Sequence, residues 1–331
     1  MSEPLKAPFP WFGGKSRVAP IVWQRFGNVK NYVEPFFGSG AVLLGKPDHI
    51  KCIETINDKD AYVANFWRAI KHDPDGVAKW ADNPVNENDL HARHIWLVQR
   101  KETLRSQVEG DPDYFDSRVA GYWVYGVCCW FGRDFCSGKG PWRLDKYNRL
   151  NKNEKGDIKN IDNLKGIMRQ RIHCVAGDHG KGIMRSNINL NSWFCILSER
   201  LTKVRVCSGD WSRVMGLTSK CEKTLSGIFL DPPYTTKANR DDNLYLEEDK
   251  YIGNDVFDWS INNGDDPCLR IALCGYEDEY NFPDTWQMIE WKAVGGLGNA
   301  NPNNNNSTRE RIWFSPHCLP EKDIQLGLFD R

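Results

Sequence analysis

The sequence predicts an α/β domain assembled from two separated parts of the chain, with a helical and irregular insertion between them. Two observations support this prediction. In both terminal parts, short apolar segments bounded by turn residues alternate with segments whose apolar residues recur at helical spacing. From about Asp73 to Thr202 this alternation stops. A chain of 331 residues is long enough for one large domain with such an insertion.

The N-terminal part has the order of a βαβ unit. Its expected elements are a helix over 18–26 with Ser16 as its N-cap, a strand over Asn31–Glu34, a glycine turn over 35–40 followed by a helix, a strand over 51–56 that ends at Asn57 and Asp58, and a helix over 63–70. Open α/β sheets bind their ligands at the carboxyl ends of such strands.

The C-terminal part returns to short apolar segments. Strands are expected over 203–207, 227–230 and 269–274, followed by a closing pair over 286–293 and 311–314. In the insertion, an apolar stripe over 119–130 predicts one helix, whereas residues 132–191 are rich in Lys, Asn and Gly and only weakly periodic. Such a segment is too long for a plain connection, so we expect it to be functional or to form a subdomain.

The composition indicates a soluble globular protein, with 40% apolar and 27% charged residues. No apolar stretch approaches the roughly 20 residues that span a bilayer. The N-terminus lacks the apolar region of a signal peptide, so we expect a cytoplasmic protein. The eleven cysteines include no C-x-x-C pair, which favours reduced and mostly buried thiols over disulfides or a metal site.

Charge is balanced overall but uneven along the chain, with 44 basic and 44 acidic residues. Residues 131–190 contain thirteen Lys/Arg and six Asp/Glu, whereas residues 235–290 contain four Lys/Arg and fourteen Asp/Glu. A basic segment of this kind can bind phosphates while the molecule stays neutral. Two solvated loops of opposite charge that pair with each other are the alternative.

The segment Asp231-Pro232-Pro233-Tyr234 directly follows an apolar strand and is the strongest candidate site. Here a carboxylate and the next carbonyl can accept both hydrogens of an exocyclic amine, which directs the nitrogen lone pair at an electrophile. The prolines remove competing backbone donors and restrict the turn. The tyrosine ring offers a stacking surface for a base taken out of a helix. An ordinary proline turn at the end of a strand is the alternative.

A second candidate site is the turn Glu34-Pro35-Phe36-Phe37-Gly38-Ser39-Gly40. Its glycines allow a ligand to approach the backbone, and without G-x-G-x-x-G or a following lysine it suits an adenosyl and methionine group better than a phosphate. Asp58, about 20 residues after the turn, can accept two ribose hydroxyls, whereas the neighbouring Asp60 can cap the next helix. Trp11 and Lys15 can cover the methionine end, although core packing would also explain them.

Together these segments resemble the Dam-like class of DNA N6-adenine methyltransferases, including bacteriophage members. The matching motifs are WFGGK (11–15), EPFFGSG (34–40), IND (56–58) and DPPY (231–234). The resemblance covers the first 70 residues and most of the chain after about residue 203. The long segment 132–191 and the acidic extension 235–266 depart from the family pattern, so the resemblance does not imply a target sequence.

The resemblance implies a Rossmann-like class I methyltransferase sheet with helices on both faces. It divides the chain into a catalytic S-adenosylmethionine-binding domain, formed by 1–75 and 203–331, and an inserted target-recognition subdomain at 76–202. The implied reaction is methyl transfer from S-adenosylmethionine to N6 of an adenine flipped out of duplex DNA. The implied partner is double-stranded DNA, with no membrane and no metal, and we expect a monomer.

The resemblance also implies roles for individual residues. The expected catalytic residues are Asp231, Pro232, Pro233 and Tyr234. The expected cofactor-binding residues are Trp11, Lys15, Glu34, Pro35, Phe36, Phe37, Gly38, Ser39, Gly40, Asp58, Asp210 and Asp231. The expected DNA-contacting residues are Arg133, Lys139, Trp142, Arg143 and Arg169 in the insertion, together with Asn305 and Arg309 of an asparagine-rich loop that, with Arg311 after it, is expected at the rim of the DNA cleft. For the asparagine-rich loop, the alternative is a solvated loop without a role in DNA binding.

Three alternatives to this function remain open. The protein could methylate N4 of cytosine, although a serine at position 231 would be more usual for that reaction. It could methylate adenine in RNA, because nothing at the amine site distinguishes ribose from deoxyribose. It could be a catalytically silent DNA-binding regulator or decoy, against which the intact set of Trp11, Asp58 and Asp231 argues.

Overall fold

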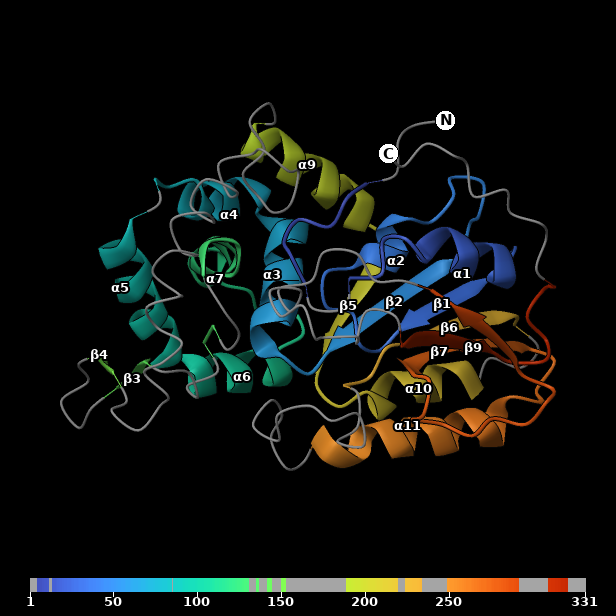
Figure 1. Cartoon of the computed structure of the whole chain (residues 1–331). Coiled ribbons are helices and arrows are strands. Elements are labelled where there is room, and N and C mark those ends of the chain that lie inside the picture. Colours follow the sequence, from blue (N-terminus) through green and yellow to red (C-terminus); the bar gives the residue numbers. More distant parts are fainter. Residues whose placement is uncertain are drawn as a thin grey trace, which may run out of the picture.

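A computed structural model of the chain describes residues 5–11, 14–84, 86–130, 135–136, 142–144, 150–152, 189–219, 224–233, 249–291 and 309–320. These residues form a seven-stranded sheet with helices on both faces, which confirms the predicted fold class (Figure 1). The strands are β1 (Asn31–Glu34), β2 (Ile53–Asp58), β5 (Val204–Ser208), β6 (Ser226–Leu230), β7 (Leu269–Tyr276), β8 (Gln287–Glu290) and β9 (Glu310–Phe314).

The strand order is β5-β2-β1-β6-β7-β9-β8. The first five strands run parallel, and β9 is antiparallel to both of its neighbours. The direction of winding reverses between β1 and β6, and α/β sheets bind ligands at the carboxyl ends of the strands beside such a point. The pairing of Val33 with Ile228 brings Glu34 and Asp231 to this edge of the sheet.

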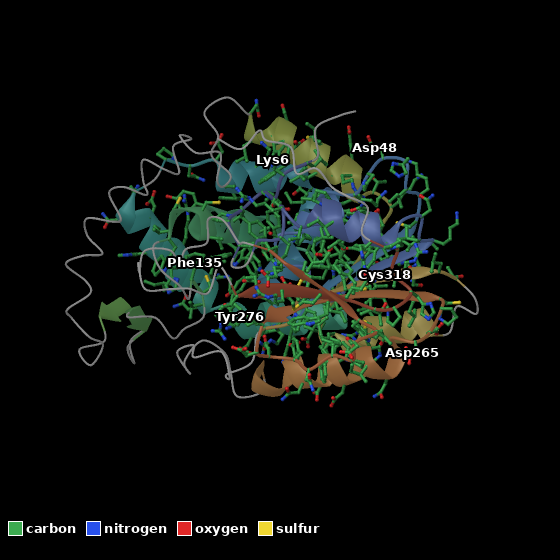
Figure 2. All side chains as sticks on the ribbon, turned by 45° about the vertical axis from the view of Figure 1, so that its right-hand side comes forward. Lys6, Asp48, Phe135, Asp265, Tyr276 and Cys318 are labelled. Atoms are coloured by element: carbon green, nitrogen blue, oxygen red, sulfur yellow. The ribbon has the colours of Figure 1, made fainter. Side chains whose placement is uncertain are left out.

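Alternate residues of the central strands face two separate apolar layers, because side chains alternate along a strand. Phe229, Ala272 and Cys274 are buried in the layer that also contains the apolar residues of α1 (Ala19–Phe26), α2 (Ala41–Leu44) and α3 (Ala61–His72). Ile228 and Ile271 are buried in the other layer, beneath α10 (Ser212–Ser219) and α11 (Asp249–Asn263). Side chains fill the space between sheet and helices (Figure 2).

The first helix begins later than the sequence predicts. Its N-cap is Val18, so the prediction of Ser16 as the cap is wrong. Pro20 lies in the first turn, where backbone N–H groups have no partner within the helix. The N–H that proline lacks is therefore not needed there, and its fixed φ suits a helix. The proline therefore defines the start of this helix without a side-chain cap.

The insertion is helical, as predicted, and lies beside one end of the sheet (Figure 1). It contains α4 (Pro74–Ala81), α5 (Glu87–Val98), α6 (Lys101–Gly110), α7 (Ser117–Cys129) and α9 (Leu190–Leu201), and an antiparallel hairpin of β3 (Trp142–Leu144) and β4 (Leu150–Lys152). The apolar stripe over 119–130 is the buried face of α7. The division of the chain at residues 76 and 202 stays a prediction.

Helices α9, α10 and α11 lie in segments where the sequence predicts none. Helix α9 packs against α3 and α4 and leads the chain back to β5. Helix α11 lies within the acidic extension and connects the parallel strands β6 and β7, which need a long crossover connection. The acidic extension therefore contributes a helix that covers one face of the sheet.

Arg68 of α3 ties the insertion to the sheet. Its Nη1 donates hydrogen bonds to the carbonyls of Val108 and Asp111, each at 2.9 Å, and to that of Tyr114 at 3.3 Å. Its Nε donates to the carbonyl of Val206 in β5 at 3.4 Å. A single buried guanidinium thus satisfies carbonyls on both sides of this junction.

Within the described parts of the chain, no helix combines the length and apolar composition that crossing a membrane requires. The nine cysteines described there are all free, as the sequence predicts. In the same residues, no group of three or more His, Cys, Asp or Glu side chains is arranged to hold a metal ion.

Candidate active site

The turn after β1 requires glycine at two positions. Gly38 and Gly40 have φ angles of 48° and 71°, which side chains disfavour. A Cβ at Gly38 would overlap the indole ring of Trp11, so this ring lies against the turn. The carbonyl of Gly38 accepts a hydrogen bond from Nε1 of Trp67 at 2.9 Å. The sequence predicts that a ligand approaches the backbone at these glycines. At Gly38, the group that lies against the backbone is the ring of Trp11.

Asp58 connects this turn to the end of β2. Its Oδ2 accepts a hydrogen bond from the backbone N–H of Gly38 at 2.8 Å, and its Oδ1 accepts one from that of Asp60 at 2.9 Å. Burial and the neighbouring Asp60 carboxylate raise the pKa of Asp58 to about 7. Asp60 also caps α3 by accepting from the N–H of Tyr62 at 2.8 Å, which confirms its predicted role as an N-cap.

A cleft of about 290 Å³ opens at the carboxyl ends of β1, β2 and β5. The predicted site residues that line it are Trp11, Pro35, Phe36, Asp58, Asp210 and Pro233. The rings of Phe36 and Trp211 stack with centroids 6.3 Å apart and an interplanar angle of 27°. Apolar rings with a few convergent acids are the usual lining of a small-molecule site. The cleft therefore has the lining expected for a nucleoside.

A charged cluster that includes Lys15 and Asp231 lies at the switch point of the sheet. Nζ of Lys15 lies 2.9 Å from Oδ2 of Asp231 and 3.8 Å from Oε2 of Glu310. The Lys15 side chain is 5% exposed, and the ammonium also lies 5.3 Å from the centre of the Trp291 ring. Burial opposes the charge, but the two carboxylates outweigh it and raise the pKa of Lys15 above its ordinary value. Lys15 therefore stays positively charged and orients Asp231.

Glu34 at the end of β1 belongs to the same buried region. Burial raises the pKa of Glu34 well above its ordinary value, against the opposing effect of a 2.7 Å hydrogen bond from the hydroxyl of Tyr32. The negative charge of Asp231 contributes in the same direction as burial. Both burial and the nearby carboxylate therefore disfavour a negative charge on Glu34.

Two residues of the predicted cofactor site point elsewhere. Phe37 is buried in the core, where its ring packs edge-on against Trp67 with centroids 5.0 Å apart. Ser39 is also buried and does not line the cleft. Gly40, at φ 71°, leads directly into α2. In this turn, Pro35 and Phe36 face the cleft while the following residues support the turn from behind.

Asp210 lies at the mouth of the cleft after β5. Its carboxylate accepts hydrogen bonds from the backbone N–H and the hydroxyl of Ser212, at 2.9 Å and 2.5 Å, at the start of α10. Its neighbour Gly209 has a φ of 120° and is held by Asn57, whose Nδ2 donates to its carbonyl at 3.0 Å. The polar contacts of this turn therefore orient Asp210 and Trp211 at the cleft.

Several predicted positions cannot be placed. Tyr234, Arg133, Lys139, Arg169 and Asn305 lie outside the described residues. Trp142 and Arg143 lie in β3, where the backbone pairs with β4. Their predicted roles, and those of the cofactor and catalytic residues, stay predictions.

The two arginines after the asparagine-rich loop differ in their surroundings. The side chain of Arg309 is 26% exposed, lies 3.3 Å from Asp278 and stacks over Tyr276. Arg311 is 5% exposed and lies 2.9 Å from Glu277 and 3.4 Å from Glu290. Arg311 is therefore buried between carboxylates of neighbouring segments, whereas Arg309 is partly accessible, and the expected place of both at the rim of a DNA cleft stays a prediction.

Several residues of this region were not predicted from the sequence, among them Trp211, which lines the cleft. Lys101 and Arg105 of α6 line the cleft, although they belong to the insertion. Their spacing of four residues on a helix is a signal that could have indicated a shared basic face. Glu310 had no comparable local signal, because its partner Lys15 lies near the other end of the chain.

Comparisons with known proteins agree with this geometry. Residues 11–175, about half of the chain, match the family of D12 class N6 adenine-specific DNA methyltransferases. The chain is 23% identical over 187 residues to the Type II methyltransferase M.MjaIII of Methanocaldococcus jannaschii. That alignment covers 53% of this chain and 62% of the relative, so the chain spans less than two thirds of the relative's length. The resemblance seen in the motifs is confirmed. The chain belongs to the D12 class of N6 adenine-specific DNA methyltransferases.

Proposed function

We propose that this protein is a site-specific DNA methyltransferase that transfers a methyl group from S-adenosylmethionine to N6 of an adenine. The observation that supports this most directly is the position of Asp231. It follows β6 at the switch point, is held by Lys15, and lies two residues before Pro233 at the cleft. Membership of an N6 adenine-specific family supports the same base and reaction.

The residues of the cleft fit S-adenosylmethionine. Asp58 would accept the ribose hydroxyls, and the stacked rings of Phe36 and Trp211 would lie against the nucleoside. Trp11, packed on the glycine turn, would close one wall. When bound, S-adenosylmethionine supplies an electrophilic methyl group on a positively charged sulfur.

The protein's own contribution is to hold the amine and direct its lone pair. The carboxylate of Asp231 and the carbonyl of Pro232 accept the two amine hydrogens. Accepting these hydrogens favours the developing positive charge on nitrogen, and placing the base in a fixed position removes much of the entropic barrier. Neither Pro232 nor Pro233 has an N–H that could compete for the same acceptors. Lys15 limits the rotation of the carboxylate through its contact with Oδ2.

The substrate is proposed to be double-stranded DNA bound by a monomer. The target adenine is paired and stacked in a duplex, so it must be flipped into the site before its amine can reach Asp231. In this proposal, residues 1–75 and 203–331 carry out catalysis and residues 76–202 recognise the target. Lys101 and Arg105 support a connection between the two, since they reach the cleft from the insertion.

The test is methyl transfer from tritiated S-adenosylmethionine to duplex DNA, followed by digestion to nucleosides. Label is expected in N6-methyl-2′-deoxyadenosine, and Asp231→Ala is expected to abolish transfer while DNA binding persists. Label in N4-methyl-2′-deoxycytidine, or preferential labelling of RNA offered beside the duplex, would reassign the substrate. DNA binding without any transfer by the wild-type protein would favour a regulator. Sequencing for modified adenines in DNA from expressing cells would then identify the sequence context.

A further inference from the structure

A second hollow lies on the insertion, between α5 and α7. Its volume is about 250 Å³, and it is lined by Asp89, Ala92, Arg93 and Trp96 of α5 and by Arg118 and Tyr122 of α7. None of these residues lines the cleft described above. We call this hollow the α5/α7 groove.

Two arginines that line this groove, Arg93 and Arg118, and a third beside it, Arg100, lie against aromatic rings. The guanidinium of Arg118 lies 4.9 Å from the ring centres of Trp80 and Trp96. The guanidinium of Arg100 lies 3.8 Å from the ring centre of Trp96. That of Arg93 lies 4.2 Å from the ring centre of Tyr125. Such contacts use the flat face of a guanidinium and leave the N–H groups at its edge directed elsewhere.

The positive charge of these arginines is not balanced locally. Among the residues that the structure describes, Arg93, Arg100 and Arg118 form no ion pair, whereas Arg309 and Arg311 each contact a carboxylate. Nη1 of Arg93 is buried without a hydrogen-bond acceptor, which is costly for a cationic donor. The acid in the groove, Asp89, accepts a hydrogen bond from Nδ2 of Asn86 at 2.8 Å. Nη1 of Arg100 donates to the carbonyl of Trp96 at 3.1 Å, and Nη2 of Arg118 donates to the hydroxyl of Tyr122 at 3.3 Å. The lining of the groove includes two arginines and one acid, so the groove carries a net positive charge that suits an anion.

The groove is connected to the catalytic cleft through the end of α5. The carbonyl of Leu97 accepts a 2.8 Å hydrogen bond from the hydroxyl of Tyr62, which lines the cleft. Lys101, which also lines the cleft, directly follows Arg100 in sequence. Arg93 lies on α5 itself, about 7.5 Å before the last residue of that helix, Val98, at a helical rise of about 1.5 Å per residue. The end of α5 and the start of α6 thus connect the groove to the border of the cleft.

We propose that the α5/α7 groove binds phosphates of the DNA backbone outside the target base pair, an inference that rests on DNA being the substrate. Guanidinium groups match phosphate geometry in paired hydrogen bonds, and their aromatic partners restrict their orientation before DNA arrives. DNA is a better fit than an acidic protein, because the chain belongs to a family of DNA methyltransferases and a duplex supplies phosphates at regular spacing. These contacts position the duplex and do not read its sequence.

The test is the salt dependence of binding to a short duplex, measured by fluorescence anisotropy. For wild type, the logarithm of the association constant falls linearly with the logarithm of salt concentration. Each lost phosphate contact lowers the slope by about 0.9. The double variant Arg93→Gln/Arg118→Gln is expected to bind more weakly, with a slope smaller by about 2 in total. Arg93→Lys/Arg118→Lys keeps both charges and is expected to retain most of the wild-type slope.

The matched control is Arg205→Gln, which removes one charge from an exposed arginine on β5. If the groove double variant had the same slope as this control, the proposal would be overturned. Thermal unfolding verifies that each variant is folded. If the double variant does not fold, Arg100→Gln replaces it, at an exposed arginine whose loss is expected to lower the slope by about 0.9. This test is independent of catalysis. Wild-type protein that binds DNA without methylating it would refute the proposed function, but the slopes would still show whether the groove binds phosphates.

Discussion

The ammonium nitrogen of Lys15 lies 2.9 Å from Oδ2 of Asp231, so the N-terminal segment holds the turn at which we place the amine. Glu310 of β9 lies 3.8 Å from the same nitrogen. One lysine therefore joins three segments that are far apart in sequence. Removing one partner of a buried ion pair is strongly destabilising, because the other charge is left uncompensated in the interior.

Replacing Lys15 with methionine is expected to lower the free energy of unfolding by about 3 kcal/mol. The change leaves the carboxylates of Asp231 and Glu310 near each other without a cation. Methyl transfer should be lost with it, because Asp231 is no longer held in place. Urea denaturation and the transfer assay measure the two effects. The control is Lys6→Met, at an exposed lysine of the same segment, and equal stability of both variants would contradict the prediction.

The pKa of Asp58 predicts how stability depends on pH. In the folded protein this pKa is about 7, compared with an ordinary value of 3.8. Between these values the folded state binds more protons than the unfolded state, so Asp58 makes the free energy of unfolding decrease as pH rises. Asp58→Asn removes this contribution. Urea titrations of both proteins should therefore show the variant gaining stability relative to wild type as pH rises from about 4 to 7, and a constant difference would refute the assignment.

Cofactor affinity should depend on pH in the opposite direction. Ribose hydroxyls donate to a carboxylate, so binding favours the ionised form of Asp58. S-adenosylmethionine is therefore expected to bind more tightly above pH 7 than below it, with release of a proton. Calorimetric titrations in two buffers of different ionisation enthalpy measure that proton. An affinity that stays flat through neutral pH would place the ribose away from Asp58.

Gly38→Ala is expected to weaken cofactor binding and to destabilise the protein by about 1–2 kcal/mol from the backbone alone. The φ of Gly38 is 48°, and a Cβ there would displace the ring of Trp11 from the wall of the cleft. Calorimetric titration with S-adenosylmethionine and chemical denaturation are the measurements. Gly110→Ala is the control, because a Cβ at that position meets no atom within 4 Å. Similar behaviour of the two variants would contradict the packing of Trp11 on the turn.

Arg68→Met is expected to lower the free energy of unfolding by about 2 kcal/mol or more. The carbonyls of Val108, Asp111 and Tyr114 would lose a charged donor at the junction of insertion and sheet. Hydrogen exchange should increase first at the end of α6 and the start of α7, since these segments lose their connection to α3. Arg17→Met, at an exposed arginine, provides the comparison. Unchanged exchange in the insertion would show that Arg68 does not hold it.

Much of the fold could be predicted because its signals are local. The strand over Asn31–Glu34 is observed at its predicted bounds, and the segment 227–230 lies within β6. The cap at Asp60 is likewise a contact between near neighbours in sequence. Helices α9 and α11 were missed because irregular or acidic sequence surrounds them, although Phe194, Leu197 and Leu201 are buried at helical spacing.

The family, the order of strands and turns, and the position of DPPY after a buried strand could all be predicted from the residues alone. Periodicity, glycine turns and proline turns act over a few residues, so they can be recognised without a structure. The contact between Lys15 and Asp231, the burial of Phe37 in the core and the carboxylates around Arg311 became known only from the folded chain. Each of these depends on which segments become neighbours in the sheet and its covering layers, and that choice is made by long-range packing.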